Sequence, residues 1–253
     1  MRNNSKRGLV FTAIGVLVCL SFISAASASV IGTLSENSAT YTGCNSTSGT
    51  GVTVTANTIT WLPTLTGSSP AAGCMTSGSG TTLTYGSGTP LGTTAQGTIQ
   101  DLTLNPSFPP VNDFMMFVIG STTLDFELTS IGPGSSNNNC NSLTNGQTCS
   151  VANSPFVLEL LNLGTEVSLG ASGLVTDNGG TTWSSWTGGF GTFISTETPA
   201  QIQSVFGTGG TGSITSTQQG NFNATIAPEP ASMTLLGAGL IAIAMAARKR
   251  RKA

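Results

Sequence analysis

No basic side chain occurs between Gly8 and Ala247 of this 253-residue chain. All eight lysines and arginines lie in the first seven and last six residues, and the chain contains no histidine. A domain built from the middle of the chain therefore has no side-chain salt bridges, so apolar burial, backbone hydrogen bonds and disulfides must stabilise it. The same deficit excludes nucleic-acid binding by this region, because neutralising phosphates needs clustered Lys and Arg.

The N-terminal residues have the three parts of a secretory signal peptide. A basic segment, residues 1–8, precedes an apolar stretch at residues 9–23. Ala26 and Ala28 then provide the small-x-small pattern of a signal peptidase site. We predict cleavage after Ala28, so residues 1–28 form a signal peptide and signal peptidase is an expected partner.

The C-terminal residues have three parts in a fixed order. Pro228, Glu229 and Pro230 come first, and the seventeen residues 231–247 follow without a charge. The chain then closes with a basic run: Arg248, Lys249, Arg250, Arg251 and Lys252. A helix of this apolar segment is near the shortest length that spans a bilayer. The positive-inside rule keeps the basic run cytoplasmic, so we predict one transmembrane helix with the rest of the chain outside.

This arrangement resembles the PEP-CTERM sorting signal of Gram-negative bacteria that make extracellular polysaccharide. The resemblance rests on the Pro228–Pro230 tripeptide, the apolar segment with Gly237 and Gly239, and the basic tail. It covers residues 228–253 and none of the body. It implies recognition by exosortase, a membrane-embedded cysteine transpeptidase-like enzyme, with cleavage near the tripeptide. This type of tail has also been called an ice-binding protein C-terminal domain, a name that carries no evidence of ice binding.

The segment between the two signals, residues 29–227, is predicted to form one extracellular domain. About 200 residues are enough for a sizeable core, burying roughly 70% of the surface that the unfolded chain exposes. Nine acids without a basic counterpart give this segment a formal charge of −9. They are Glu36, Asp101, Asp113, Asp125, Glu127, Glu159, Glu166, Asp177 and Glu197.

Four cysteines remain in this segment: Cys44, Cys74, Cys140 and Cys149. An even number in an exported protein favours two disulfides, for which four cysteines allow three pairings. We favour Cys44–Cys74 and Cys140–Cys149, because each pair closes a local loop rich in Gly, Ser, Thr and Asn. A metal site is disfavoured, since no pair has CxxC spacing and the chain has no histidine.

Between turn-forming residues the body has the pattern of short β-strands. Apolar and polar residues alternate over residues 51–55, around Ile59 and Trp61, and most clearly over residues 124–128. Continuous apolar runs at residues 114–119 and 156–163 predict strands buried on both faces. Further strands are predicted at residues 167–175, 189–194, 213–216 and 221–226, with turns at 145–146 and 177–180. This spacing predicts an all-β fold, an antiparallel sandwich or jelly roll.

One short helix is predicted after Thr198. Thr198, Pro199 and Gln201 provide the N-cap, the N1 proline and the N3 glutamine of a capping box. Apolar residues follow at helical spacing as far as Phe206, and Gly207 supplies the stop. We expect this helix to cover one end of the sandwich.

Candidate catalytic groups in the body are limited to carboxylates and hydroxyls, because Ser/His and Cys/His nucleophile systems need a histidine. Asp125 and Glu127 lie on one face of a predicted strand, about 7 Å apart by pleat geometry, which suits a glycosidase pair. A solvated outer face explains them more simply, so we predict no catalytic residue and no enzymatic activity. The uncompensated acids predict weak, diffuse Ca²⁺ binding without a dedicated metal site.

Aromatic residues offer a further class of site. Trp183 and Trp186 lie in a Gly/Ser/Thr-rich segment and are candidates for stacking on sugar rings, whereas Trp61 is expected in the core. Our leading hypothesis is a non-enzymatic protein that exosortase processes and that serves at the cell surface or in the exopolysaccharide matrix of a Gram-negative bacterium. A carbohydrate-binding module, less so an ice-binding one, and a carboxylate-based glycan hydrolase are the alternatives.

Overall fold

The computed structural model describes residues 30–55, 58–104, 110–152, 154–178, 183–206, 212–226, 237–240 and 243. One compact unit spans Ala28–Pro228, and a second comprises Met1–Ser27 and Glu229–Ala253. The predicted signal peptide with Ala26 and Ala28, the Pro228–Pro230 tripeptide and the basic run 248–252 lie outside the described residues. Of the predicted transmembrane segment only residues 237–240 and 243 are described, and they are helical. Within the described part of the chain, no helix combines the length and apolarity needed to cross a bilayer.

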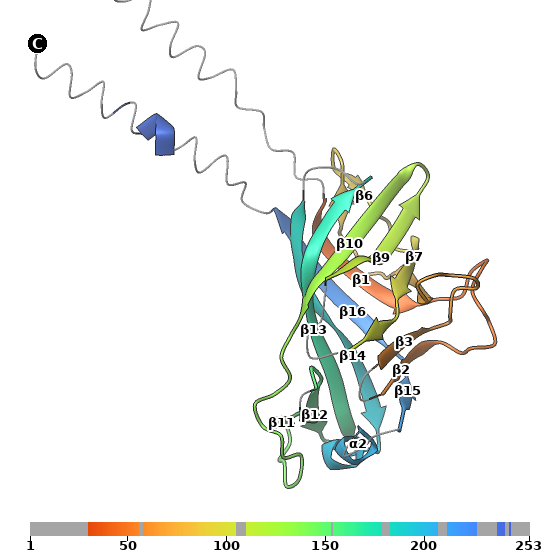
Figure 1. Ribbon diagram of the computed structural model, residues 1–253, viewed down its shortest axis with the longest axis vertical. Coiled ribbons are helices and arrows are strands. Elements are labelled where there is room, and N and C mark those ends of the chain that lie inside the picture. Colours follow the sequence, from red (N-terminus) through yellow and green to blue (C-terminus); the bar gives the residue numbers. More distant parts are fainter. Residues whose placement is uncertain are drawn as a thin grey trace, which may run out of the picture. The chain divides into compact units, whose positions relative to one another are not determined.

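Eight antiparallel strands form a closed barrel (Figure 1). Hydrogen-bonded neighbours follow the order β10-β9-β7-β4-β1-β16-β14-β13, and β13 pairs back onto β10 to close the ring. The bounds are β1 (Val30–Ser38), β4 (Ala72–Ser77), β7 (Gln96–Gln100), β9 (Val111–Ile119), β10 (Thr122–Ile131), β13 (Gly164–Asp177), β14 (Ser184–Ser195) and β16 (Gln219–Ile226).

The predicted all-β antiparallel fold is confirmed, but a closed barrel stands in place of the predicted sandwich or jelly roll. Strands β10 and β13 pair from Leu124 opposite Asp177 to Ile131 opposite Ala171. This pairing satisfies the backbone groups of two strands that would otherwise be sheet edges. A spacing of short strands along the sequence does not reveal which strands pair across such a distance.

A separate four-stranded antiparallel sheet packs against β14. Its order is β15 (Ile214–Ser216), β2 (Gly51–Val54), β3 (Thr58–Leu62) and β8 (Leu102–Thr103). The ring of Trp61 on β3 lies 4.6 Å from that of Phe190 on β14, so the predicted core position of Trp61 is confirmed. Four short strands extend the main sheet: β5 (Thr84–Tyr85), β6 (Thr89–Pro90), β11 (Thr148–Cys149) and β12 (Val157–Leu161).

Strand β13 changes its partner halfway along its length. Its first half pairs with β12 as far as Ser168, and its second half pairs with β10 from Ala171 onward. Strand β14 pairs with β13 throughout, whereas its pairing with β16 ends at Gly191 opposite Gln219. Both long strands therefore continue beyond the closed ring, toward the helix α2 (Figure 1). The sheet is open on the β16 side of β14 at that point.

Aromatic rings fill the interior of the barrel. Trp186, Phe126 and Phe222 are each almost completely buried, with the Trp186 ring 6.2 Å from Phe126 and 5.4 Å from Phe222. The indole nitrogen of Trp186 donates to the carbonyl oxygens of Glu127 and Leu174 at 3.1 and 3.0 Å. Side chains fill the interior of an eight-stranded barrel, so this interior is a packed core.

The strand patterns are confirmed only in part. The apolar positions of residues 124–128 are fully buried and the two carboxylates between them face outward, as predicted. The two apolar runs predicted as buried on both faces are so only in part. Phe114 and Met115 of β9 are consecutive and fully buried, but Val118 of the same strand is 60% exposed. Leu158 is the one fully buried residue of β12, which lies outside the closed ring.

Both favoured disulfide pairings are confirmed. Cys44–Cys74 fastens the loop that follows β1 to strand β4. Cys140–Cys149 closes an Asn-rich loop onto β11. Each cross-link limits the conformations of the unfolded chain, which compensates for the lack of ion pairs.

The helix α2 (Pro199–Phe206) forms with the predicted capping box. The Thr198 amide donates to Gln201 Oε1 at 2.8 Å, and the Gln201 amide donates to Thr198 Oγ1 at 3.4 Å. Ile202 and Phe206 are buried beneath the helix. The amide of Gln203 donates to the carbonyl oxygens of Asn138 and Ser150, which holds the Asn-rich loop against the helix.

Replacing Trp186 by Ala should lower the free energy of unfolding by about 3–5 kcal/mol, because a cavity replaces a buried ring with two hydrogen bonds. Trp183→Ala is the matched control, since Trp183 is partly exposed and its loss should cost less than about 1 kcal/mol. Urea denaturation followed by circular dichroism measures both. Equal losses in the two variants would contradict the assignment of Trp186 to the barrel core.

Candidate functional site

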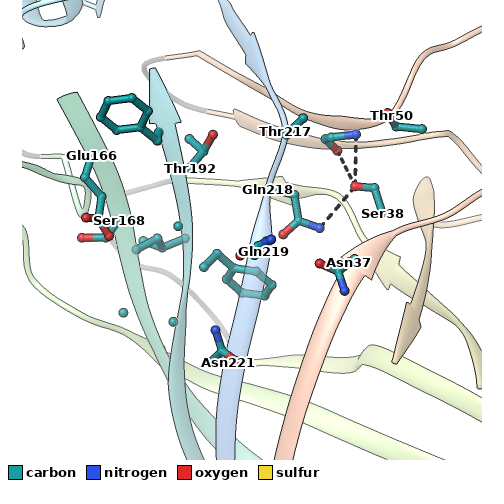
Figure 2. A pocket seen from close by; sticks show the side chains of 17 residues that line it. Asn37, Ser38, Thr50, Glu166, Ser168, Thr192, Thr217, Gln218, Gln219 and Asn221 are labelled. Atoms are coloured by element: carbon teal, nitrogen blue, oxygen red, sulfur yellow. Dashed lines mark hydrogen bonds between the residues drawn. The ribbon is translucent and has the colours of Figure 1, made fainter. Parts of the chain in front are cut away.

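A polar trough of about 910 Å³ lies across β13, β14, β16 and β1, beside the loop that leads into β2 (Figure 2). Four amide side chains define it: Asn37, Gln218, Gln219 and Asn221. Ser, Thr and Gly residues make up most of the remaining wall, and Glu166 is the only charged residue among those that line it. The trough is therefore rich in hydrogen-bonding groups that carry no charge.

The strand register explains why residues from distant parts of the chain meet here. Asn37 of β1 lies opposite Gln219 of β16, and Gln219 lies opposite Gly191 of β14. Gly191 in turn lies opposite Ser168 of β13. Residues that face each other in neighbouring strands share one side of a sheet. One row of small and polar groups thus crosses four strands of the barrel wall.

Glycines hollow this part of the wall. Gly189 and Gly170 lie opposite each other in the next row, beside Asn221. A Cβ atom at Gly191 or Gly170 would meet no other atom closer than 3.8 Å, so packing does not require glycine at either position. Glycine inside a strand weakens the strand and often marks a bulge, a bend, or a close approach by a ligand or another backbone segment. At Gly170 the backbone of Gly132 makes such an approach. The missing side chains leave the trough open.

Gln218 lies at the floor of the trough and is 6% exposed. Its amide nitrogen donates to Glu36 Oε2 at 3.1 Å and to Ser38 Oγ at 3.3 Å. Its amide oxygen is buried without a hydrogen-bond partner, and Figure 2 shows this oxygen on the side away from Ser38. A buried acceptor without a partner costs about 1–3 kcal/mol. Less than 1 Å² of this oxygen is exposed, so a group placed in the trough does not reach it.

Ser38 extends this contact to the smaller sheet. Its hydroxyl accepts a bond from the Gly51 amide at 3.0 Å and lies 3.3 Å from the Gly51 carbonyl oxygen, to which it donates. Gly51 is the first residue of β2. A chain of hydrogen bonds therefore links Gln218 to β2 through Ser38.

Glu36 is completely buried next to Gln218. Burial raises the pKa of Glu36 to about 7, and the hydrogen bond from Gln218 opposes this only in part. The second carboxylate oxygen has no hydrogen-bond partner, and a Cβ atom at Gly220 would lie 2.4 Å from it. Glycine at position 220 thus makes room for a carboxylate inside the barrel wall.

A pair of carboxyl groups lies on β9 and β10, outside the trough. Asp113 has a φ of 53°, and the side-chain amide of Gln100 donates to its carbonyl oxygen at 2.9 Å. Its carboxyl group is hydrogen-bonded to that of Asp125. The pKa of Asp125 is raised to about 6. Burial is the largest cause, followed by the charge and hydrogen bond of Asp113 and then by the charge of Glu127. The sequence placed Glu127 near Asp125 but missed Asp113, because the register shift that brings it there has no sequence signature.

The predicted sugar-stacking tryptophans are not in the trough. Trp186 is 1% exposed, so its prediction as a stacking residue is wrong: its ring belongs to the barrel core. Trp183 is partly buried and does not line the trough. The exposed aromatic ring of the trough is Phe193, which is 44% exposed and lies opposite Glu166. The three-residue spacing from the buried Phe190 was the available signal, because it places Phe193 on the opposite face of β14.

Within the ranges that the structure describes, no group of three or more His, Cys, Asp or Glu side chains is arranged to hold a metal ion. Weak, diffuse Ca²⁺ binding by the acidic surface stays a prediction.

A family model described as the PEP-CTERM protein-sorting motif matches residues 227–251. The chain therefore carries the sorting signal that Pro228, Glu229, Pro230 and the basic tail predicted. The match includes none of the residues that line the trough. No curated protein and no solved structure matches the chain.

The buried Glu36 should make the protein less stable as the pH rises. Its pKa is about 7 in the folded protein against 4.5 for the ordinary group, so its stabilising contribution is complete below pH 4.5 and is lost as the pH passes 7. Glu36→Gln should remove on the order of 3 kcal/mol of this pH dependence. Urea unfolding at pH values from 4 to 8 measures it.

The control for this prediction is Glu159→Gln, which removes a carboxylate that is not fully buried. This variant should retain the loss of stability with rising pH that Glu36 causes. An unchanged pH dependence in Glu36→Gln would show that Glu36 does not titrate in a buried state.

Proposed function

We propose that this protein is a non-enzymatic component of the cell surface or extracellular matrix, which exosortase processes and which stays beside the exopolysaccharide of its cell. The sorting motif at residues 227–251 carries the proposal. The motif implies an exported protein that is transiently anchored in the membrane and then processed by exosortase. The body then acts outside the membrane.

The composition of the body supports a passive extracellular role. Two disulfides suit an oxidising compartment outside the cytosol. A body without Lys, Arg or His lacks the side chains on which most acid–base and nucleophilic catalysis depends. Its Ser, Thr and Asn side chains hydrogen-bond to water and to polysaccharide alike.

Carbohydrate binding is the second candidate function, and the polar trough favours it. Small-ligand sites combine a concave shape with a few well-placed polar groups. The trough has that shape, four amide side chains and an exposed ring at Phe193. A glycan held in the trough would not contact Asp113, Asp125 or Glu127, because none of them lines it. We therefore do not extend the proposal to glycan hydrolysis.

The double variant Pro228→Ala with Glu229→Ala should stay in the membrane with its C-terminal segment intact, because exosortase would no longer recognise the motif. The wild-type chain should give a shorter extracellular species. Intact-mass analysis of the membrane and extracellular fractions locates the cleavage points at both ends of the chain.

The control is Pro110→Ala with Glu159→Ala, which removes the same residue types from the body. This control should be exported and trimmed like the wild type. If the Pro228 and Glu229 double variant gives the same trimmed extracellular species, exosortase processing at the motif is wrong.

A further inference from the structure

We infer that the polar trough binds an uncharged, hydroxyl-rich polysaccharide chain, with the amides of Gln219 and Asn221 bonding to sugar hydroxyls and Phe193 packing against a sugar ring at its edge. The inference rests on the proposed association with exopolysaccharide. It adds the binding site and the chemical class of the ligand.

The exposed amides of β16 determine what kind of group the trough can bind. Gln219 and Asn221 line the trough and are exposed. An amide side chain both donates and accepts hydrogen bonds, as a sugar hydroxyl does. Gln218 lies beneath them and is not a contact, because Glu36 and Ser38 accept its amide hydrogens and its oxygen is buried.

The charges of the body select against acidic polymers. Residues 29–227 carry nine acids and no base, and Glu166 lies in the trough wall itself. Like charges near a protein surface repel a charged ligand over roughly 10 Å at moderate salt. No Lys or Arg is present in the body to offset this repulsion. The ligand that suits the trough is therefore neutral.

The shape of the trough suits a chain of sugars better than a single enclosed one. Its lining residues come from four adjacent strands, β13, β14, β16 and β1, which span about 15 Å at the usual strand spacing. The glycines at positions 170, 189 and 191 keep the middle of this path free of side chains. Phe193 at one edge provides an apolar ring against which the C–H face of a sugar can pack.

Gly191→Val tests the inference directly, because its added side chain enters the trough. The first atom of that side chain would lie 3.8 Å from Glu166 Oε1 and 4.0 Å from the Val167 carbonyl oxygen, so the strand can accept it. Valine is also a favourable residue in strands. Asn221→Ala is the second test variant, and Asn223→Ala is its control, two residues further along the same strand but outside the trough.

The binding experiment uses the full chain in a non-glycosidic detergent, so that it does not depend on processing. The probes are soluble oligosaccharides of neutral α-glucan, β-glucan, mannan and galactan, with alginate as the acidic comparison, and calorimetry gives each Kd. We expect at least one neutral probe to bind. Gly191→Val and Asn221→Ala should weaken that binding about tenfold or more, while Asn223→Ala leaves it unchanged.

Three results would overturn the inference: no binding of any neutral probe, tighter binding of alginate, or equal affinity in Gly191→Val and Asn223→Ala. Thermal unfolding of each variant confirms that a loss of binding is not a loss of folding. Fractionation of cells that express Gly191→Val separates this inference from the proposed function. If the variant is exported and trimmed normally but does not bind the oligosaccharide, the trough is supported as the binding site. Defective export of the wild type would contradict the proposed function alone.

Discussion

The pairing of β10 with β13 closes the sheet, and the remaining architecture depends on that closure. Once the ring is closed, one face of every barrel strand points into a confined interior, where Trp186 and its neighbouring phenylalanines pack. Gly173 of β13 lies opposite Trp186, and a Cβ atom there would come within 1.8 Å of the Glu127 carbonyl oxygen. Small residues in the wall thus make room for large aromatic residues in the core, and no ion pair is needed.

The body has no basic residue, which limits where its acidic residues can lie. Most acids of the body can be solvated on the surface, but Glu36 is buried with no cation to balance it. Gln218 and Gly220 are the residues that accommodate this carboxylate, one by donating a hydrogen bond and the other by lacking a side chain. The same arrangement orients the Gln218 amide toward the trough. The buried carboxylate and the floor of the trough therefore share one set of contacts.

Local sequence patterns predicted the local features of the fold well. The alternation at residues 124–128, the capping box at Thr198 and the Cys140–Cys149 disulfide each involve residues close in sequence, and each is present in the structure. The Cys44–Cys74 disulfide joins residues 30 positions apart and is also present. Closure of the barrel and the candidate site depend on distant residues. Gln218 and Glu36 are 182 positions apart. Nothing in the sequence around Gln218 therefore indicates that its side chain is buried or that its amide oxygen lacks a hydrogen-bond partner. The prediction that Trp186 is exposed was wrong for a similar reason. Its Gly- and Ser-rich neighbours indicate the outer face of β14, whereas its ring points into the barrel.

The contact from Gln218 through Ser38 to Gly51 has a mechanical consequence. It joins the barrel to the first residue of β2, and so it bridges the two sheets at the point where β16 leaves β14. A ligand bound at this junction would therefore be coupled to both sheets through one set of hydrogen bonds, and not to a single strand at an edge.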